Sequence, residues 1–121
     1  MYKIRTDQVK NRLYITLGGI LSMEEAQKTK SVIESSIKTL KPNFDVINDM
    51  SKLIRSDEVA GIVLKEIIIM LIQNGVKRVV RVVGTSKTGL IQFANNSLQI
   101  EQYKISYVPS IEDAEEFLNQ P

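Results

Sequence analysis

The sequence predicts an α/β fold, with one domain built on a mixed β-sheet of about five strands, flanked by helices and opened by an N-terminal β-hairpin. Two observations predict it. The chain begins with two segments of alternating character, and after them helix-like and strand-like patterns follow each other in turn. The chain has 121 residues, of which 43% are apolar, so it can bury a sizeable core. We expect a single domain over residues 1–121.

The opening hairpin is predicted from residues 2–6 and 13–17, which both alternate between apolar and polar side chains. Asp7, Lys10 and Asn11 lie between the two segments and are typical of a turn. The first two strands should therefore pair with each other in an antiparallel manner.

The first helix should begin at Ser22. Glu25 follows three residues later, which is the spacing at which a hydroxyl and a carboxylate satisfy each other's backbone N–H groups at a helix start. Pro42 ends the helical pattern. Small and apolar side chains recur at three- and four-residue steps along one face: Ala26, Thr29, Ile33, Ile37 and Leu40.

A third strand is predicted over residues 44–48, and a second helix over residues 59–73. The segment Ser56, Asp57 and Glu58 offers a cap and first-turn negative charge for this helix. The pair Asn74 and Gly75 is a typical helix end.

Residues 79–83 are nearly all β-branched, as in a strand that is covered on both faces in a parallel sheet. A loop over 84–89, a short helix over 90–97 and a fifth strand over 103–108 should follow. The last helix is predicted from a capping pair, Ser110 with Asp113, and an apolar stripe of Ile111, Ala114, Phe117 and Leu118.

Cysteine and histidine are absent from the chain. Their absence excludes zinc sites built on thiolates or imidazoles, Ser-His-Asp and Cys-His nucleophilic systems, and disulfides. Chemistry based on carboxylate, Lys, Tyr or Ser remains open, but these residues form no recognisable catalytic constellation. We therefore expect no enzymatic activity, no cofactor and no metal.

The net charge is +2, and the chain has no block of Lys and Arg, so we expect no nucleic-acid partner. The start of the chain lacks the apolar stretch of a signal peptide, which favours a cytoplasmic protein. The second helix is too short to cross a membrane and carries Lys65 and Glu66.

Three stretches resemble the STAS domain, the fold of bacterial anti-sigma factor antagonists such as SpoIIAA-like proteins. Residues 13–19 precede a capped helix, residues 45–51 look like that family's strand ending in Asp-Leu-Ser, and residues 73–84 look like its helix, turn and strand. The resemblance covers nearly the whole chain. It implies a regulatory module that binds a protein partner.

Antagonists of that family carry an Asp-Ser-Ser-Gly motif after this strand, and phosphorylation of its serine switches off partner binding. Counting from Asp49, the aspartate of the motif falls on Asp57 and the phosphorylated serine falls on Glu58. Val59 and Ala60 replace the Ser-Gly, and a slip of one residue would bring Ser56 to this place. The resemblance thus implies a partner-binding surface without the phosphoserine motif.

The second helix offers a candidate partner-binding surface because its polar face is unusually apolar. Its core side should be formed by Val59, Ala60, Val63, Leu64, Ile67 and Leu71. The candidate surface consists of Ser56, Asp57, Glu58, Ile62, Lys65, Ile69 and Ile72. Two interpretations stay open, namely a capped and fully buried helix, or a docking surface through which the chain forms a homodimer or binds a regulatory partner.

A small-ligand binder is the alternative function. The loop of Gly84, Thr85, Ser86 and Lys87 could bind a nucleotide or another anion through backbone N–H groups and side chains. Its glycines have the separation of a P-loop, but Leu90 and Ile91 replace the Lys and Ser/Thr of that motif. An apolar molecule held between the sheet and a helix is a second possibility for this class.

Two further groups of charged residues lie near the predicted third and fourth strands. Asp45, Asp49 and Asp57 should cluster around the end of the third strand, where open α/β sheets often bind ligands, and Asp49 could instead accept backbone hydrogen bonds in a turn. A solvated rim is predicted for Lys77, Arg78 and Arg81.

Overall fold

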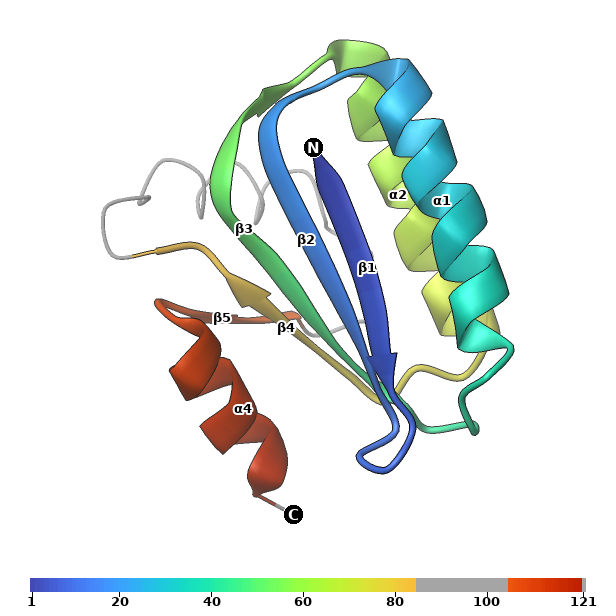
Figure 1. The fold of residues 1–121 in the computed structure, drawn as a ribbon, viewed down its shortest axis with the longest axis vertical. Helices are drawn as coiled ribbons and strands as arrows, with labels where there is room; N and C mark the ends of the chain where they lie inside the picture. Colours follow the sequence, from blue (N-terminus) through green and yellow to red (C-terminus); the bar gives the residue numbers. More distant parts are fainter. Residues whose placement is uncertain (85–104, 121) are drawn as a thin grey trace.

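The computed structural model describes residues 1–84 and 105–120, which form a five-stranded sheet with helices on both faces (Figure 1). The strands lie side by side in chain order. β1 is antiparallel to β2, and every other neighbouring pair is parallel. The mixed sheet and the N-terminal hairpin are therefore confirmed. The strands are β1 (Tyr2–Asp7), β2 (Arg12–Leu21), β3 (Asp45–Ser56), β4 (Arg78–Val82) and β5 (Ile105–Val108).

Two long helices, α1 (Met23–Ile37) and α2 (Glu58–Gln73), cover one face of the sheet, and α4 (Ile111–Asn119) lies on the other face (Figure 1). Connections between parallel strands are almost always right-handed. Because β2, β3 and β4 follow one another in the same direction across the sheet, the two helices that connect them must lie on the same side. The predicted helix over 90–97 lies outside the described residues.

The core has two parts because successive side chains of a strand point to opposite faces of the sheet, and helices cover both faces. The larger cluster lies between the sheet and the pair α1 and α2, and includes Leu13, Ile33 and Phe44. The smaller cluster lies between the sheet and α4. The smaller cluster consists of Tyr14, Ile47, Val80, Val82, Ala114 and Leu118.

The helix starts follow the predicted capping residues. The backbone N–H of Glu25 donates to Ser22 Oγ over 3.2 Å, and that of Asp113 donates to Ser110 Oγ over 3.1 Å. The reciprocal half of the first capping box is absent, since Glu25 Oε2 instead pairs with the Met1 amino group at 2.8 Å. At the end of α2, Gly75 has a φ of 84°, which glycine adopts without strain.

β2 and β3 are longer than predicted, with 10 and 12 residues. The turn-forming residues Gly18, Gly19 and Asp49 suggested strand ends, but they lie inside the strands. The pairing of β2 with β3 shifts register on either side of Gly18 and Gly19, and a glycine within a strand commonly accompanies such a bulge. Asp49 Oδ1 does accept a hydrogen bond from the Ser51 backbone N–H, as predicted, but within β3.

Candidate functional site

The predicted partner-binding segment begins where β3 passes into α2. Ser56 is the last residue of β3 and pairs with Leu21, the last residue of β2. The Asp57 backbone N–H donates to the Leu21 carbonyl over 3.0 Å. Asp57 occupies the N-cap of α2, although its side chain makes no capping hydrogen bond, and Glu58 is the first helical residue. The sheet edge where β2 and β3 end therefore also carries the starts of α1 and α2.

The outer face of α2 exposes large apolar side chains. Ile62 is 57% exposed and Ile69 is 45% exposed, while Ile72 is half-buried and Lys65 is exposed. Val59 was predicted in the core, but it is exposed because it lies one turn before Ile62 on the same helix face. The buried face is instead formed by Ala60, Val63, Ile67, Ile68 and Leu71, and Leu64 is half-buried against it.

Ile69 borders a surface groove of about 450 Å³ between α1 and α2. Ile37 and Met70 add apolar surface to this groove. An ion pair between Lys30 Nζ and Glu66 Oε2, 3.1 Å apart, joins the two helices beside it. Apolar side chains surrounded by charged ones are typical of the centre and rim of a protein interface.

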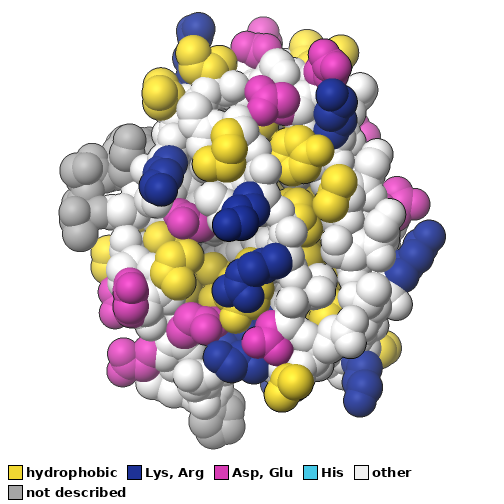
Figure 2. Space-filling view, in the orientation of Figure 1, with side chains coloured by type: hydrophobic (Ala, Val, Ile, Leu, Met, Phe, Trp, Pro, Cys, Tyr) yellow, Lys and Arg dark blue, Asp and Glu magenta, His cyan; other side chains and the backbone are white. Residues whose placement is uncertain are grey.

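Further apolar side chains are exposed near the start of α2. Ile20 and Ile54 lie close to the ends of β2 and β3, and Met23 begins α1; all three are exposed. Figure 2 shows hydrophobic side chains in the upper part of the molecule, where these elements meet. Exposed apolar side chains therefore lie both on α2 and near the ends of β2 and β3.

The predicted cluster of three aspartates does not form. Asp45 is the first residue of β3, Asp49 lies inside that strand, and Asp57 follows its end. Four residues of extended strand span about 13 Å, so the three carboxylates are spread along β3. Within residues 1–84 and 105–120, no group of three or more Asp and Glu side chains is placed to hold a metal ion.

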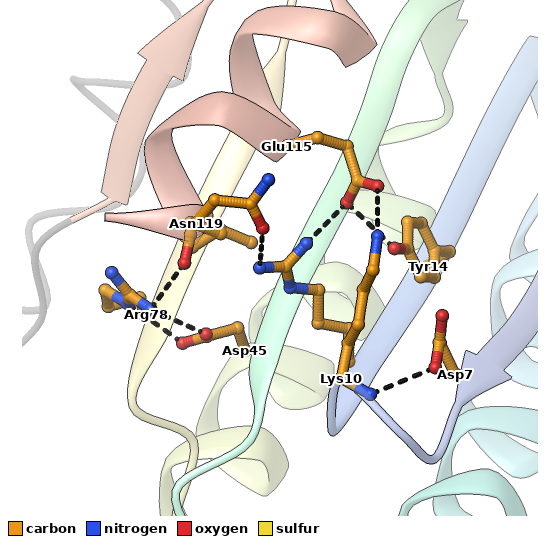
Figure 3. A network of polar contacts seen from close by, with 9 residues as sticks. Asp7, Lys10, Tyr14, Asp45, Arg78, Glu115 and Asn119 are labelled. Atoms are coloured by element: carbon orange, nitrogen blue, oxygen red, sulfur yellow. Dashed lines mark hydrogen bonds and ion pairs between the residues drawn. The ribbon is translucent and has the colours of Figure 1, made fainter. Parts of the chain in front are cut away.

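On the opposite face, a polar network attaches α4 to the sheet (Figure 3). Glu115 Oε1 accepts hydrogen bonds of 2.8 Å from Arg12 Nη1 and from the Tyr14 hydroxyl, and Glu115 Oε2 pairs with Lys10 Nζ at 3.3 Å. Arg12, which is buried, also donates to Asn119 Oδ1 over 2.8 Å. The sequence reasoning missed this network. Its signal was the pair Arg12 and Tyr14 on one strand face and the pair Glu115 and Asn119, four residues apart, on one helix face.

A second ion pair lies beside this network. Arg78 binds the buried carboxylate of Asp45 through Nε at 3.1 Å and Nη2 at 2.9 Å, and it also donates to the carbonyls of Leu118 and Gln120 at the end of α4. The prediction that Lys77, Arg78 and Arg81 form a solvated rim is therefore wrong for Arg78 and Arg81. Arg81 is buried because it points toward the core under α1 and α2.

The sequence matches no family model and no curated protein. The structure is similar to a protein of the DUF3478 family with a SpoIIAA-like fold from Shewanella loihica, with 17% identity, a TM-score of 0.73, and coverage of 98% of this chain and 92% of the other. It is also similar to the anti-sigma factor antagonist SpoIIAA in its unphosphorylated form, with 16% identity, a TM-score of 0.66 and full coverage of both chains. This chain has the SpoIIAA-like fold.

A third similar structure with this SpoIIAA-like fold is a putative anti-sigma factor antagonist from Thermotoga maritima. It has 16% identity, a TM-score of 0.67, and coverage of 98% of this chain and 95% of the other. The resemblance inferred from residues 13–19, 45–51 and 73–84 is thereby confirmed at the level of the fold.

Two other predicted features of this SpoIIAA-like chain concern ligands. Thr85, Ser86 and Lys87 of the predicted anion-binding loop lie outside the described residues, and Gly84 is the last residue before them. Between the sheet and the helices α1 and α2, the structure shows a cavity of about 30 Å³. Pockets for small organic ligands are roughly ten times larger or more.

Among the described helices, none is long and apolar enough to cross a membrane.

The α4 network makes stability depend on pH in a defined direction. Burial disfavours ionisation of Glu115, but the hydrogen bonds from Tyr14, Lys10 and Arg12 outweigh this effect, so its pKa lies below the ordinary value of 4.5. The pKa of Tyr14 is raised, first by burial and then by its bond to Glu115. The ionised Glu115 therefore stabilises the fold above about pH 4.5, and this contribution is lost as the pH falls through the lowered pKa.

We expect the wild-type chain to lose more free energy of unfolding than a Glu115→Gln variant when the pH is lowered from about 6 to about 3. Glu25, whose pKa is also lowered, chiefly by its bond to the N-terminal amino group, is common to both proteins, so the difference between them isolates Glu115. Urea unfolding at a series of pH values measures it. Parallel pH profiles of the two proteins would contradict the assignment.

Proposed function

We propose that this chain is a non-catalytic, cytoplasmic regulatory module that binds a protein partner and associates with itself through α2. The contact surface, called the α2 surface below, consists of Ser56, Asp57, Glu58, Ile62, Lys65, Ile69 and Ile72. The exposure of Ile62 and of Ile69, which borders the groove between α1 and α2, carries the proposal. Contiguous exposed apolar surface usually marks an interaction site.

The SpoIIAA-like fold supports a protein partner for this surface. Structures similar to this chain include anti-sigma factor antagonists, and SpoIIAA itself has been solved in unphosphorylated and phosphorylated forms. In this chain Glu58 stands at the position that the resemblance assigns to the phosphorylated serine. Its carboxylate carries a fixed negative charge at the start of a helix, where the helix dipole favours an anion.

The chemistry of the α2 surface defines the partner that fits it. Ile62 and Ile69 require an apolar counterpart, whereas Asp57 and Glu58 at the helix start favour a basic group. Binding that relies on the fixed charge of Glu58 needs no kinase. Detection of phosphorylated Ser56 in the protein isolated from its host would contradict this version of the proposal.

Self-association is tested by light scattering over a range of protein concentrations. We expect the mass of the wild-type chain to rise toward that of a dimer, and the Ile62→Glu variant to remain a monomer, because a buried unpaired carboxylate opposes the contact. Val9→Glu is the matched control, since Val9 is 98% exposed in the turn between β1 and β2, at the end of the sheet opposite the start of α2 (Figure 1). A wild-type chain that stays monomeric at millimolar concentration would overturn this part.

Partner binding is tested with the same three proteins. Each is immobilised and exposed to a lysate of its host. A protein retained by the wild type and by Val9→Glu, but lost with Ile62→Glu, is expected. Equal retention by all three would show that the α2 surface is not the contact.

A further inference from the structure

A pair of polar side chains lies within the apolar layer between the sheet and the helices α1 and α2. Asn48 in β3 and Arg81 in β4 are direct neighbours in the parallel register. Both line the cavity of about 30 Å³, together with core residues such as Ile33 and Leu71. Arg81 is only 5% exposed, and Asn48 is half-buried with its Oδ1 atom inside the protein, so the facing polar atoms of this pair lie in the interior.

One buried atom of each side chain has no hydrogen-bond partner among the residues that the structure describes. These atoms are the Nε of Arg81 and the Oδ1 of Asn48. The first is a donor and the second is an acceptor. Buried polar atoms in folded proteins are nearly always satisfied, and where the protein offers no partner an ordered water usually does so.

Among the described residues, two other polar groups lie near Arg81, and neither supplies the missing hydrogen bonds. Across the sheet, Arg81 is also the register neighbour of Tyr107, and the centre of its guanidinium lies 5.9 Å from the centroid of that ring. On the helix side, the Thr29 hydroxyl lines the cavity but donates to the Glu25 carbonyl over 2.7 Å. Neither group pairs with Arg81 Nε or with Asn48 Oδ1.

We propose that this cavity is an internal water-binding site, in which ordered water accepts a hydrogen bond from Arg81 Nε–H and donates one to Asn48 Oδ1. A water needs a cavity of about 10 to 15 Å³, so about 30 Å³ holds one molecule or two in a chain. Water satisfies the donor and the acceptor together. A small anion would satisfy the arginine but repel the amide oxygen, and an apolar molecule would satisfy neither.

The direct test is nuclear magnetic resonance of the Arg81 Nε–H group. In the wild-type chain we expect a cross peak between this proton and water with the sign of a molecule bound for longer than the tumbling time of the protein. Asn48→Leu removes the acceptor at similar volume, and the cross peak should be lost. Leu64→Met changes another cavity residue while keeping both polar atoms, so the cross peak should remain.

A crystal structure at high resolution, from crystals grown in bromide, separates water from an anion. Density of oxygen size within hydrogen-bond distance of Arg81 Nε and Asn48 Oδ1, or a chain of two such peaks, supports the proposal. An anomalous bromide signal in the cavity would overturn it in favour of an anion site. A cavity without density, or a water cross peak that persists in Asn48→Leu, would also overturn it.

Discussion

Replacement of Glu115 by alanine is expected to lower the free energy of unfolding by about 2 to 3 kcal/mol. The carboxylate binds Arg12, Tyr14 and Lys10 at once. Its loss leaves the buried guanidinium of Arg12 with Asn119 as a neutral partner. Burying a charge without its counter-charge costs several kcal/mol, and the partial exposure of Glu115 reduces that cost. Urea unfolding followed by circular dichroism measures the change.

Glu116 supplies the matched control for this experiment, because it is the next residue on α4 and is exposed. Glu116→Ala should change the free energy of unfolding by less than about 0.5 kcal/mol, as exposed substitutions usually do. If the two variants lost stability equally, the effect would come from the net charge of the helix and not from the network.

The second large effect is expected for Phe44→Ala, at about 3 to 5 kcal/mol. Phe44 directly precedes β3, is 1% exposed and belongs to the larger core cluster. Its removal opens a cavity under α1 and α2 that the neighbouring strands cannot close, because close-packed interiors relax only in part. Thermal and urea unfolding should both report the loss.

Phe117→Ala makes the same chemical change at a side chain that is 38% exposed on α4. Its cost should be smaller, at about 1 to 2 kcal/mol, since less apolar area leaves the core than at Phe44. Similar losses in Phe44→Ala and Phe117→Ala would mean that the aromatic rings act through the denatured state and not through native packing.

The described helices were the most predictable elements because local residues determine their ends. Ser22 and Ser110 cap α1 and α4 as predicted, and Asn74 with Gly75 ends α2. Such signals act over one helical turn, so they can be found in a sequence without knowledge of the fold. The position of the candidate partner-binding segment at the start of α2 followed from the same signals.

The strand ends and the polar contacts were less predictable because they depend on distant partners. Gly19 and Asp49 have the local character of turn residues, yet the pairing of β2 with β3 continues through them. The burial of Arg81 and the contact of Glu115 with Arg12 arise from which sheet face each residue meets. Val59 shows the same limit within one helix. Its apolar character does not indicate whether it lies on the buried or the exposed face of α2, and it lies on the exposed one.

The strand order of the sheet has a consequence for how the chain folds. Each described strand after the first pairs with the strand that precedes it in the chain, so the sheet can grow from the β1–β2 hairpin by adding one strand at a time. Each addition joins strands that are neighbours in the chain, which limits the entropy cost of that step. The bonds from Glu115 to Lys10 and Arg12 instead join residues separated by 105 and 103 positions. The C-terminal helix α4 therefore connects the last described element of the chain directly to the β1–β2 hairpin, where the sheet begins.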